Sequence, residues 1–244
     1  MYKYETHLHT SEGSRCASST GAEMARAHKA MGYDGIFVTD HFFNSSTTVP
    51  RELPWEQRID LYCKGYENAL EEGRRIGPDV FFGVEWTVNG ADFLLYDMDK
   101  QWLKENERLL SCPNEYASEL DLFDEVKNSG GFIVHAHPFR EAGYIPHISL
   151  YPHHVDAVET VNTRNSDPLF GGNTVFNDRA KQYAMMFGLP QTGGSDTHNA
   201  GQIVNGGILV PEKINTPADY LRQIKSGLVV PLEGDFNTKT SEKT

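Results

Sequence analysis

The sequence predicts a mixed α/β fold, in the form of a β/α barrel or a wound parallel sheet. Short apolar segments of strand character alternate with helical segments along the whole chain, as in successive βαβ units. The chain has 244 residues, 39% of them hydrophobic, which is enough for one sizeable core of the usual barrel length. Polar side chains that can bind metal follow several of the predicted strands, where ligands bind in such folds.

Capping and breaking residues set the order of elements in the first half. Thr20 and Glu23 have the spacing of a capping box, and Gly32 ends the helix that they begin. The expected elements are a strand at 2–6, a helix from 20 to 32, a strand at 35–39, a loop at 44–54, a helix at 55–76, and strands at 80–84 and 92–96.

Glycines punctuate the second half in the same way. Gly130 and Gly131 separate a helix from a strand, and Gly188 ends another helix. The expected elements are a helix at 113–129, strands at 132–134 and 155–161, a helix at 173–187, a short lead-in at 190–192, a late strand at 207–210, a helix at 216–225 and an apolar end at 228–232. We expect one domain over residues 1–236 and a polar tail over 237–244.

Five polar motifs lie next to predicted strands. They are His7-Leu8-His9, Asp40-His41, Gly83-Val84-Glu85, His135-Ala136-His137-Pro138 and Ser195-Asp196-Thr197-His198. In an extended chain, residues i and i+2 point to the same side, so His7 and His9 can share one cation. Each motif alone is weak, but five in one chain at strand ends predict a metal cluster.

The types of ligand indicate a catalytic rather than a structural metal site. Imidazole nitrogen and carboxylate oxygen suit zinc, iron and manganese, and Glu85 can bridge two cations. Cys16, Cys63 and Cys112 have no ligand spacing and are expected to be free thiols of a reducing compartment. A mixed set of His and carboxylates is typical of catalytic metal with positions open to water.

In this order the motifs resemble those of the PHP superfamily (polymerase and histidinol phosphatase). That family has His-x-His after its first strand, then Asp-His, Gly-x-Glu, His-Pro and Ser-Asp-x-His, and the match runs from His7 to His198. The resemblance implies a distorted β/α barrel, often of seven strands, with the metal site at the C-terminal ends of the strands. It also implies up to three metal ions and hydrolysis of phosphate esters.

Carried over residue by residue, the resemblance makes His7, His9, Glu85 and Asp196 ligands of one ion. Glu85 would bridge to a second ion held with His137 and with Asp92, which stands where many relatives have a His. His41 and His198 would hold a third ion. Relatives usually complete that third shell with an Asp or His from the loop after His9, and here Glu12 is chosen, with Cys16 as the alternative. We expect two to three divalent ions, Zn, Mn or Fe.

Four residues are candidates for catalysis. Arg140, just after His137-Pro138, can hold two oxygens of a phosphate at once, and Arg164 is a weaker candidate for the same role. His198 or His135 can transfer a proton to the leaving group. For His135, an equally good interpretation is a core histidine or one that orients a ligand.

The charge and composition of the chain limit the kinds of partner that it can bind. The net charge of -12 and the pI near 5.2 argue against sequence-independent binding of nucleic acid, which needs Lys and Arg. No stretch has the length of a membrane span and no signal region begins the chain, so a cytoplasmic protein is expected. The sequence leaves the oligomeric state open.

The favoured function is hydrolysis of a small-molecule phosphate monoester by a metal-activated water. One alternative is an amidohydrolase-like enzyme that cleaves a C–N bond, but such enzymes usually have a lysine ligand at a mid-barrel strand, and no lysine occurs in the motifs. Another is a non-enzymatic, metal-stabilised regulatory module, which we would expect to have lost several ligands. The motifs leave open which phosphate ester is the substrate.

Overall fold

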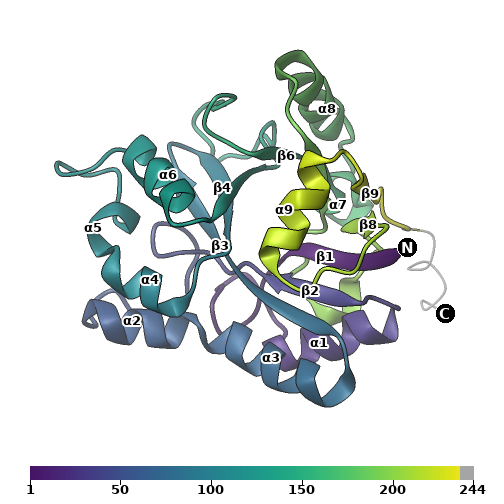
Figure 1. Cartoon of the computed structure of the whole chain (residues 1–244), viewed down its shortest axis with the longest axis horizontal. Coiled ribbons are helices and arrows are strands. Elements are labelled where there is room, and N and C mark those ends of the chain that lie inside the picture. Colours follow the sequence, from purple (N-terminus) through teal and green to yellow (C-terminus); the bar gives the residue numbers. More distant parts are fainter. Residues whose placement is uncertain (237–244) are drawn as a thin grey trace.

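The computed structural model describes residues 1–236, so the predicted tail at 237–244 lies outside the described residues. Within that range nine strands form one curved sheet, with helices around its outside (Figure 1). The order across the sheet is β7-β6-β5-β4-β3-β2-β1-β8-β9. The strands are β1 (Tyr2–Leu8), β2 (Gly35–Val38), β3 (Asp79–Val88), β4 (Ala91–Tyr96), β5 (Phe132–Ala136), β6 (Ala157–Asn162), β7 (Gln191–Gly194), β8 (Ile208–Val210) and β9 (Val230–Pro231).

The sheet nearly closes into a barrel, because β1 meets β7 at one end and β8 at the other. The backbone N–H of Asp196, just after β7, donates to the carbonyl of His7 at 2.8 Å. At the opposite end of β1, Tyr2 and Tyr4 pair with β8 in antiparallel register. The expected count of seven strands is therefore not confirmed: β1 to β7 run in order, and the β8–β9 pair extends the sheet beyond β1.

One antiparallel strand interrupts an otherwise parallel order in the main run. The pairs β1–β2, β2–β3, β5–β6 and β6–β7 are parallel, whereas β4 is antiparallel to both β3 and β5. The beginning of β4 therefore lies at the same edge as the C-terminal ends of its neighbours. Asp92, near the start of β4, is thus brought to the edge that carries the other motifs.

Helices follow the predicted order, with different bounds. The predicted helix 55–76 is split at Cys63, and the one predicted at 113–129 begins only at Glu119. The helices are α1 (Gly21–Ala30), α2 (Trp55–Tyr62), α3 (Lys64–Ile76), α4 (Lys100–Glu105), α5 (Glu107–Leu110), α6 (Glu119–Asn128), α7 (Thr163–Ser166), α8 (Val175–Phe187) and α9 (Pro217–Lys225), with 3₁₀ turns η1 (Pro168–Phe170) and η2 (Ala200–Gln202). Helix α1 begins with the predicted capping box of Thr20 and Glu23.

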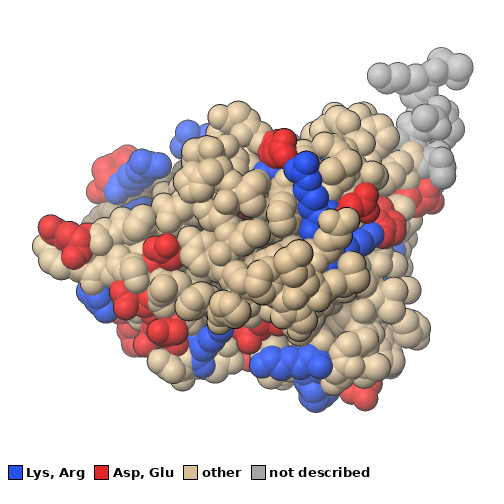
Figure 2. Space-filling model, turned by 90° about the horizontal axis from the view of Figure 1, so that it is seen from above, with Lys and Arg blue, Asp and Glu red and all other residues tan. Residues whose placement is uncertain are grey.

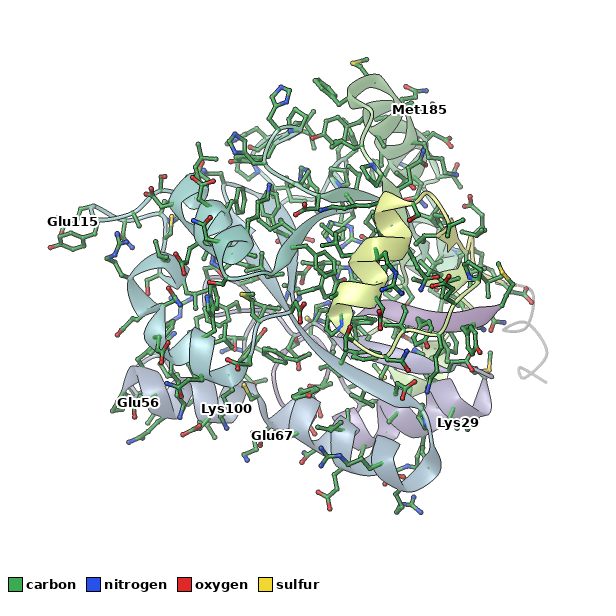
Figure 3. All side chains as sticks on the ribbon, in the orientation of Figure 1. Lys29, Glu56, Glu67, Lys100, Glu115 and Met185 are labelled. Carbon is green, nitrogen blue, oxygen red and sulfur yellow. The ribbon has the colours of Figure 1, made fainter. Side chains whose placement is uncertain are left out.

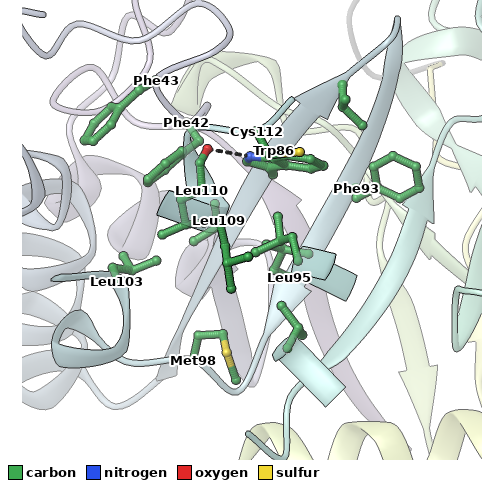
Figure 4. Packing of buried hydrophobic residues seen from close by; sticks show 14 of the residues in the cluster. Phe42, Phe43, Trp86, Phe93, Leu95, Met98, Leu103, Leu109, Leu110 and Cys112 are labelled. Carbon is green, nitrogen blue, oxygen red and sulfur yellow. Dashed lines mark hydrogen bonds between the residues drawn. The ribbon is translucent and has the colours of Figure 1, made fainter. Parts of the chain in front are cut away.

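The strands are covered on both faces. One cluster of buried residues packs β3 and β4 against α2, α4, α5 and α6, and in it the indole N–H of Trp86 donates to the carbonyl of Leu110 at 3.1 Å (Figure 4). A second cluster packs α9 through Tyr220 against Phe37, Tyr96 and Phe132. Burial on both faces leaves the strand ends as the place where polar groups can gather.

Charged side chains lie mainly at the periphery. Glu67 and Lys100, labelled in Figure 3, form a surface ion pair at 2.8 Å between α3 and α4. On the face drawn in Figure 2, basic and acidic groups are scattered over a mostly uncharged surface. In residues 1–236, no helix is both long enough and apolar enough to cross a bilayer.

Helix α3 packs closely on α1 and on the loop after β1, and Gly65 of α3 makes this close packing possible. A Cβ on Gly65 of α3 would lie 2.0 Å from Thr10 Oγ1 and 2.8 Å from Asp40 Oδ2. We therefore expect Gly65→Ala to lower the free energy of unfolding by about 1–3 kcal/mol through overpacking. Urea denaturation measures the change. The matched control is Gly143→Ala, whose added methyl would meet no described atom within 4 Å. Equal denaturation midpoints for the two variants would contradict the packing argument.

Candidate metal centre

The carboxylate of Glu85 is the centre of the polar cluster. It is 1% exposed, and its Oε1 lies 3.2 Å from Nε2 of both His7 and His137. Its Oε2 lies 3.5 Å from Nε2 of His9 and in contact with Nδ1 of His41. Four imidazoles from three parts of the chain thus converge on one buried carboxylate.

Asp196 closes the cluster from the side of β7. Its Oδ1 lies 3.2 Å from His9 Nε2 and 3.8 Å from His7 Nε2. Its Oδ2 lies 2.7 Å from a guanidinium nitrogen of Arg140. His7, His9, Glu85 and Asp196, which the sequence assigns to one ion, are therefore neighbours in space.

The imidazole tautomers suit metal binding. The Nδ1 of His7 lies 3.0 Å from a carboxylate oxygen of Glu159, so Nδ1 is a donor and Nε2, which faces Glu85 and Asp196, is the atom that would bind a cation in place of a proton. The hydroxyl of Ser14 donates to Asp40 at 2.7 Å, so at 3.1 Å it accepts from Nδ1 of His9. Metal-binding histidines commonly donate their second nitrogen to such partners.

Several buried polar atoms at the cluster lack well-directed hydrogen bonds among residues 1–236. They are Oε2 of Glu85 and Nδ1 of His41, which contact each other, and Oδ2 of Asp196, which pairs with Arg140. Buried polar atoms without directed hydrogen bonds are costly. Divalent cations bound by nitrogen and oxygen would satisfy them, so the residues present fit the ions that the sequence predicts.

The electrostatics keep the carboxylates ionised. Burial alone would raise the pKa of Glu85, but His41 and His7 outweigh it and hold this pKa well below its usual value. Burial acts in the same direction on Asp196, where Arg140 and His7 outweigh it and lower the pKa. Both groups are thus charged and able to coordinate cations near neutral pH.

Two of the candidate ligands have left-handed backbone. His137 has φ of 26° and Asp196 has φ of 57°, in a region that Asp tolerates better than most L-residues. At His137 such a conformation costs about 1–3 kcal/mol and persists because surrounding structure imposes it. At His137 the backbone N–H donates to Glu159 at 2.9 Å, and at Asp196 it donates to the carbonyl of His7.

Asp92 lies where a second ion is predicted. One carboxylate oxygen accepts from the hydroxyl of Thr87 at 2.5 Å, and the other lies 3.9 Å from Nδ1 of His137. Glu85, Asp92 and His137 each offer a ligand atom within 4.8 Å of the others. His9, His41 and His198 form a comparable group on the other side of Glu85, at the predicted third ion.

The structure does not bring Glu12 into the cluster. Both of its carboxylate oxygens accept from the backbone N–H of Gly21, at 3.2 and 3.1 Å, and one also accepts from Asn68 at 2.9 Å. Glu12 therefore stabilises the start of α1, where a carboxylate is favoured by the helix dipole. Cys16, the alternative, is the residue of this loop whose side chain lies beside His41 and His198. Burial raises its pKa, but hydrogen bonds with these imidazoles outweigh burial and lower the pKa to about 6.

His135 is a core histidine. Its ring stacks on Phe93 at 4.8 Å and contacts Tyr151 and Tyr183 edge-on. Neither ring nitrogen has a hydrogen-bond partner within the described chain, and burial lowers its pKa to about 3. The proposed role of His135 in proton transfer is not supported, because the turn at His137 breaks the alternation and separates the two imidazoles.

Glu159 and Ser14 were missed by the sequence-based assignment. Glu159 is a fully buried carboxylate in β6 that contacts His7, the backbone of His137 and the amide of Asn162. The available signal was a lone acidic residue inside the apolar run Ala157 to Val161. Ser14 gave no comparable signal, since serine is common in loops.

A cavity of about 470 Å³ opens above the cluster. Its lining includes His41, Asp92, Arg140, Tyr144, Arg164 and His198. Arg140 is fixed by Asn162 and Asn165, each at 2.9 Å, in addition to Asp196. Arg164 lies 3.3 Å from Nδ1 of His198, and its guanidinium packs over the ring of Phe170 at 3.8 Å. The cavity thus has acidic and imidazole groups at its floor and two arginines at its wall.

Comparisons with known proteins agree with this geometry. A family model described as PHP-associated matches residues 175–229. Comparison with curated protein sequences finds no match. Among solved structures, the fold is similar to that of a protein from Bifidobacterium adolescentis provisionally classed as a metal-dependent phosphoesterase. The TM-score is 0.55 and the identity 16%, over 93% of this chain and 96% of that one.

Two further structures have the same fold. One is a two-domain protein from Bacteroides vulgatus described as containing a predicted PHP-like metal-dependent phosphoesterase, with 18% identity and a TM-score of 0.62 over 96% of this chain and 65% of that one. The other, from Chromobacterium violaceum, is named an amidohydrolase and holds sulfate and no metal, with 14% identity and a TM-score of 0.55 over 94% of this chain and 98% of that one. The structures show the same fold, and the family model over residues 175–229 supports the resemblance to the PHP superfamily.

The contact between Glu159 and His7 leads to a prediction about metal affinity. Glu159→Gln removes the charged acceptor that fixes the His7 tautomer, and changes of this kind typically lower metal affinity about 10–100-fold. Competition with a chelator, followed by elemental analysis, measures the effect. Glu12→Gln is the matched control, because Glu12 contacts α1 rather than the cluster, and it should retain the parent's affinity. Loss of metal in the control, or none in Glu159→Gln, would refute this assignment.

Proposed function

We propose that the protein is a metal-dependent phosphoesterase that hydrolyses a small-molecule phosphate monoester. The observation that carries this proposal is the single buried carboxylate of Glu85 surrounded by four imidazoles, two of them oriented through Nδ1 so that their Nε2 atoms face it. The arrangement supports a cluster of cations bridged by one carboxylate. The descriptions of the Bifidobacterium and Bacteroides proteins support the same class of reaction.

The proposed ligand sets follow the spatial groups. His7, His9, Glu85 and Asp196 would hold one ion, and Glu85, Asp92 and His137 a second. His41 and His198 would hold a third. We propose two to three divalent ions per chain, chosen from Zn, Mn and Fe because the donors are mainly imidazole and carboxylate. When bound, such ions polarise phosphoryl oxygens and lower the pKa of a coordinated water.

The protein's own residues would bind and orient the ester. Arg140 is held by Asn165 through Nε and by Asn162 and Asp196 through one terminal nitrogen, which leaves its other terminal nitrogen at the wall of the cavity to donate to a phosphate oxygen. Arg164 stands on the other side of the cavity beside His198. His198 donates from Nδ1 to its own segment's carbonyl at Asp196, at 2.8 Å, so its Nε2 is the atom that can bind metal.

The leaving group has space beside the cluster. A second hollow of about 350 Å³ shares Arg140, Tyr144 and Arg164 with the cavity above the cluster. Phe170 and Phe176 line its far part, so it offers both apolar and cationic contacts. A phosphate monoester with a sizeable organic part would fit this pair of hollows better than a bare small alcohol phosphate.

The amidohydrolase alternative is kept because of the Chromobacterium neighbour. Its weakness is chemical, since no lysine is among the described residues that line the cavity. The deciding experiment is a panel of phosphate esters, amides and lactones tested with protein reconstituted with Zn, Mn or Fe. We expect release of inorganic phosphate, and strong loss of turnover and metal in His7→Ala, which lacks a proposed ligand. Cleavage of amides or lactones alone would refute the phosphoesterase proposal.

Arg140 provides a more specific test. A lost charge-assisted contact to phosphate is worth roughly 1.5–3 kcal/mol, so Arg140→Ala should lower kcat/KM about ten- to a hundredfold. Arg140→Lys should recover only part of the lost kcat/KM, because an ammonium group cannot donate to several partners in the fixed planar geometry of a guanidinium. Metal content is measured on the same samples and should stay at the parent's level, since a guanidinium is not a ligand. A fall in metal content would instead assign Arg140 to holding Asp196 in place.

A further inference from the structure

The loop between β1 and α1 presents Cys16 to the metal centre in a fixed position. The backbone on one side is held by Arg15, whose N–H donates to Ser46 at 2.8 Å, and on the other by Ser18, whose N–H donates to the carbonyl of His198 at 2.9 Å. The side chain lies in hydrogen-bonding reach of both His41 and His198 and lines the cavity with them. Cys16 is thus anchored to the two segments that carry these histidines.

The surroundings of Cys16 point to a ligand rather than to a packed thiol. The rings of His41 and His198 both lie 4.2 Å from the ring of His9, and both imidazoles are within hydrogen-bonding reach of Cys16 at the wall of the cavity. The other two cysteines differ, since Cys63 and Cys112 are 1% exposed and belong to the hydrophobic core. Burial raises the pKa of each, to about 12 and about 11.

We propose that Cys16 is a thiolate ligand, together with His41 and His198, of one ion of the centre, and that this donor set makes the position select Zn²⁺ or Fe²⁺ over Mn²⁺ and Mg²⁺. The proposal rests on the metal centre of the proposed function. Thiolate and imidazole favour softer ions, whereas an all-oxygen set favours Mn²⁺ and Mg²⁺.

The same comparison of soft and hard donor atoms predicts which ion each side of the centre prefers. The group of Glu85, Asp92 and His137 has two carboxylates and one imidazole. It is a harder set of donor atoms than the proposed set of Cys16 with two imidazoles. The two flanks of Glu85 would therefore differ in preference: Mn²⁺ binds better on the side of Asp92 and Zn²⁺ better on the side of Cys16. A mixed-metal centre is the expected state when both ions are supplied.

Spectroscopy on the cobalt-substituted protein tests the sulfur ligand without relying on activity. Co²⁺ added to metal-free parent protein should give near-ultraviolet thiolate-to-cobalt charge-transfer absorption along with the visible bands of nitrogen- and oxygen-bound cobalt. Cys16→Ala and Cys16→Asp should lose the charge-transfer absorption and keep the visible bands. The buried thiols of Cys63 and Cys112 should stay unreactive to a thiol reagent in every variant, which verifies that the variants are folded.

Metal analysis supplies the second readout. Cys16→Ala should retain about one zinc ion fewer per chain than the parent, since a ligand is lost. Cys16→Asp should restore the ion count but shift retention from zinc toward manganese when the two compete. In the parent, added Zn²⁺ should protect Cys16 from alkylation.

The outcomes separate the two proposals. Visible cobalt bands without charge-transfer absorption in the parent, or alkylation of Cys16 that zinc does not slow, would overturn the thiolate assignment and leave the metal centre standing. Absence of any cobalt binding in the parent would overturn the metal centre itself, and the thiolate ligand with it. An unchanged zinc-to-manganese ratio in Cys16→Asp would overturn the claim of selectivity.

Discussion

The rest of the structure depends on how the fold compensates several carboxylates that are buried away from water. Glu85, Glu159, Asp196 and Asp40 are each no more than 3% exposed, and they lie at one edge of the sheet. An isolated buried carboxylate is strongly unfavourable, so each must be offset by a cation or by several donors. Imidazoles offset Glu85, Arg140 offsets Asp196, and three donors from Thr10 and Ser14 satisfy Asp40. The need to place these donors next to the carboxylates in turn fixes the paths of the loops that follow the strands.

The unusual topology serves the same cluster. A purely parallel barrel would bring to this edge only residues at the ends of strands. Because β4 runs antiparallel, a residue near its start, Asp92, reaches the edge between Glu85 and His137. The closure through β1 also matters, since the N–H of Asp196 bonds to the carbonyl of His7 and so links the last motif to the first. The first and last strands of the main run, β1 and β7, are thus held together at the site.

The clustering of strand-end residues could be predicted from sequence because residue type and local position determine it. His7, His9, His41, Glu85, His137, Asp196 and His198 are brought together, as the motifs indicated, and so is Asp92, as the family resemblance implied. Loop residues could not be assigned in this way. Glu12 offers the expected carboxylate, but the path of the loop directs it to α1 and directs Cys16 to the cluster. For His135 the sequence left two interpretations open, and the structure favours the core histidine, because the backbone turns at His137 and strand alternation does not continue through it.

The candidate ligands are supported by contacts with the chain itself. His7 and His9 are held by Glu159 and Ser14 through their Nδ1 atoms, and the left-handed backbone at His137 and Asp196 is maintained by hydrogen bonds from within the barrel. A module that used metal only for stability would gain most if the ions ordered an otherwise loose site. Here packing and hydrogen bonds orient the side chains beside a cavity with two arginines at its wall. Preorganised ligands beside space for an anion are what catalysis requires, because the geometry must be ready when the substrate arrives.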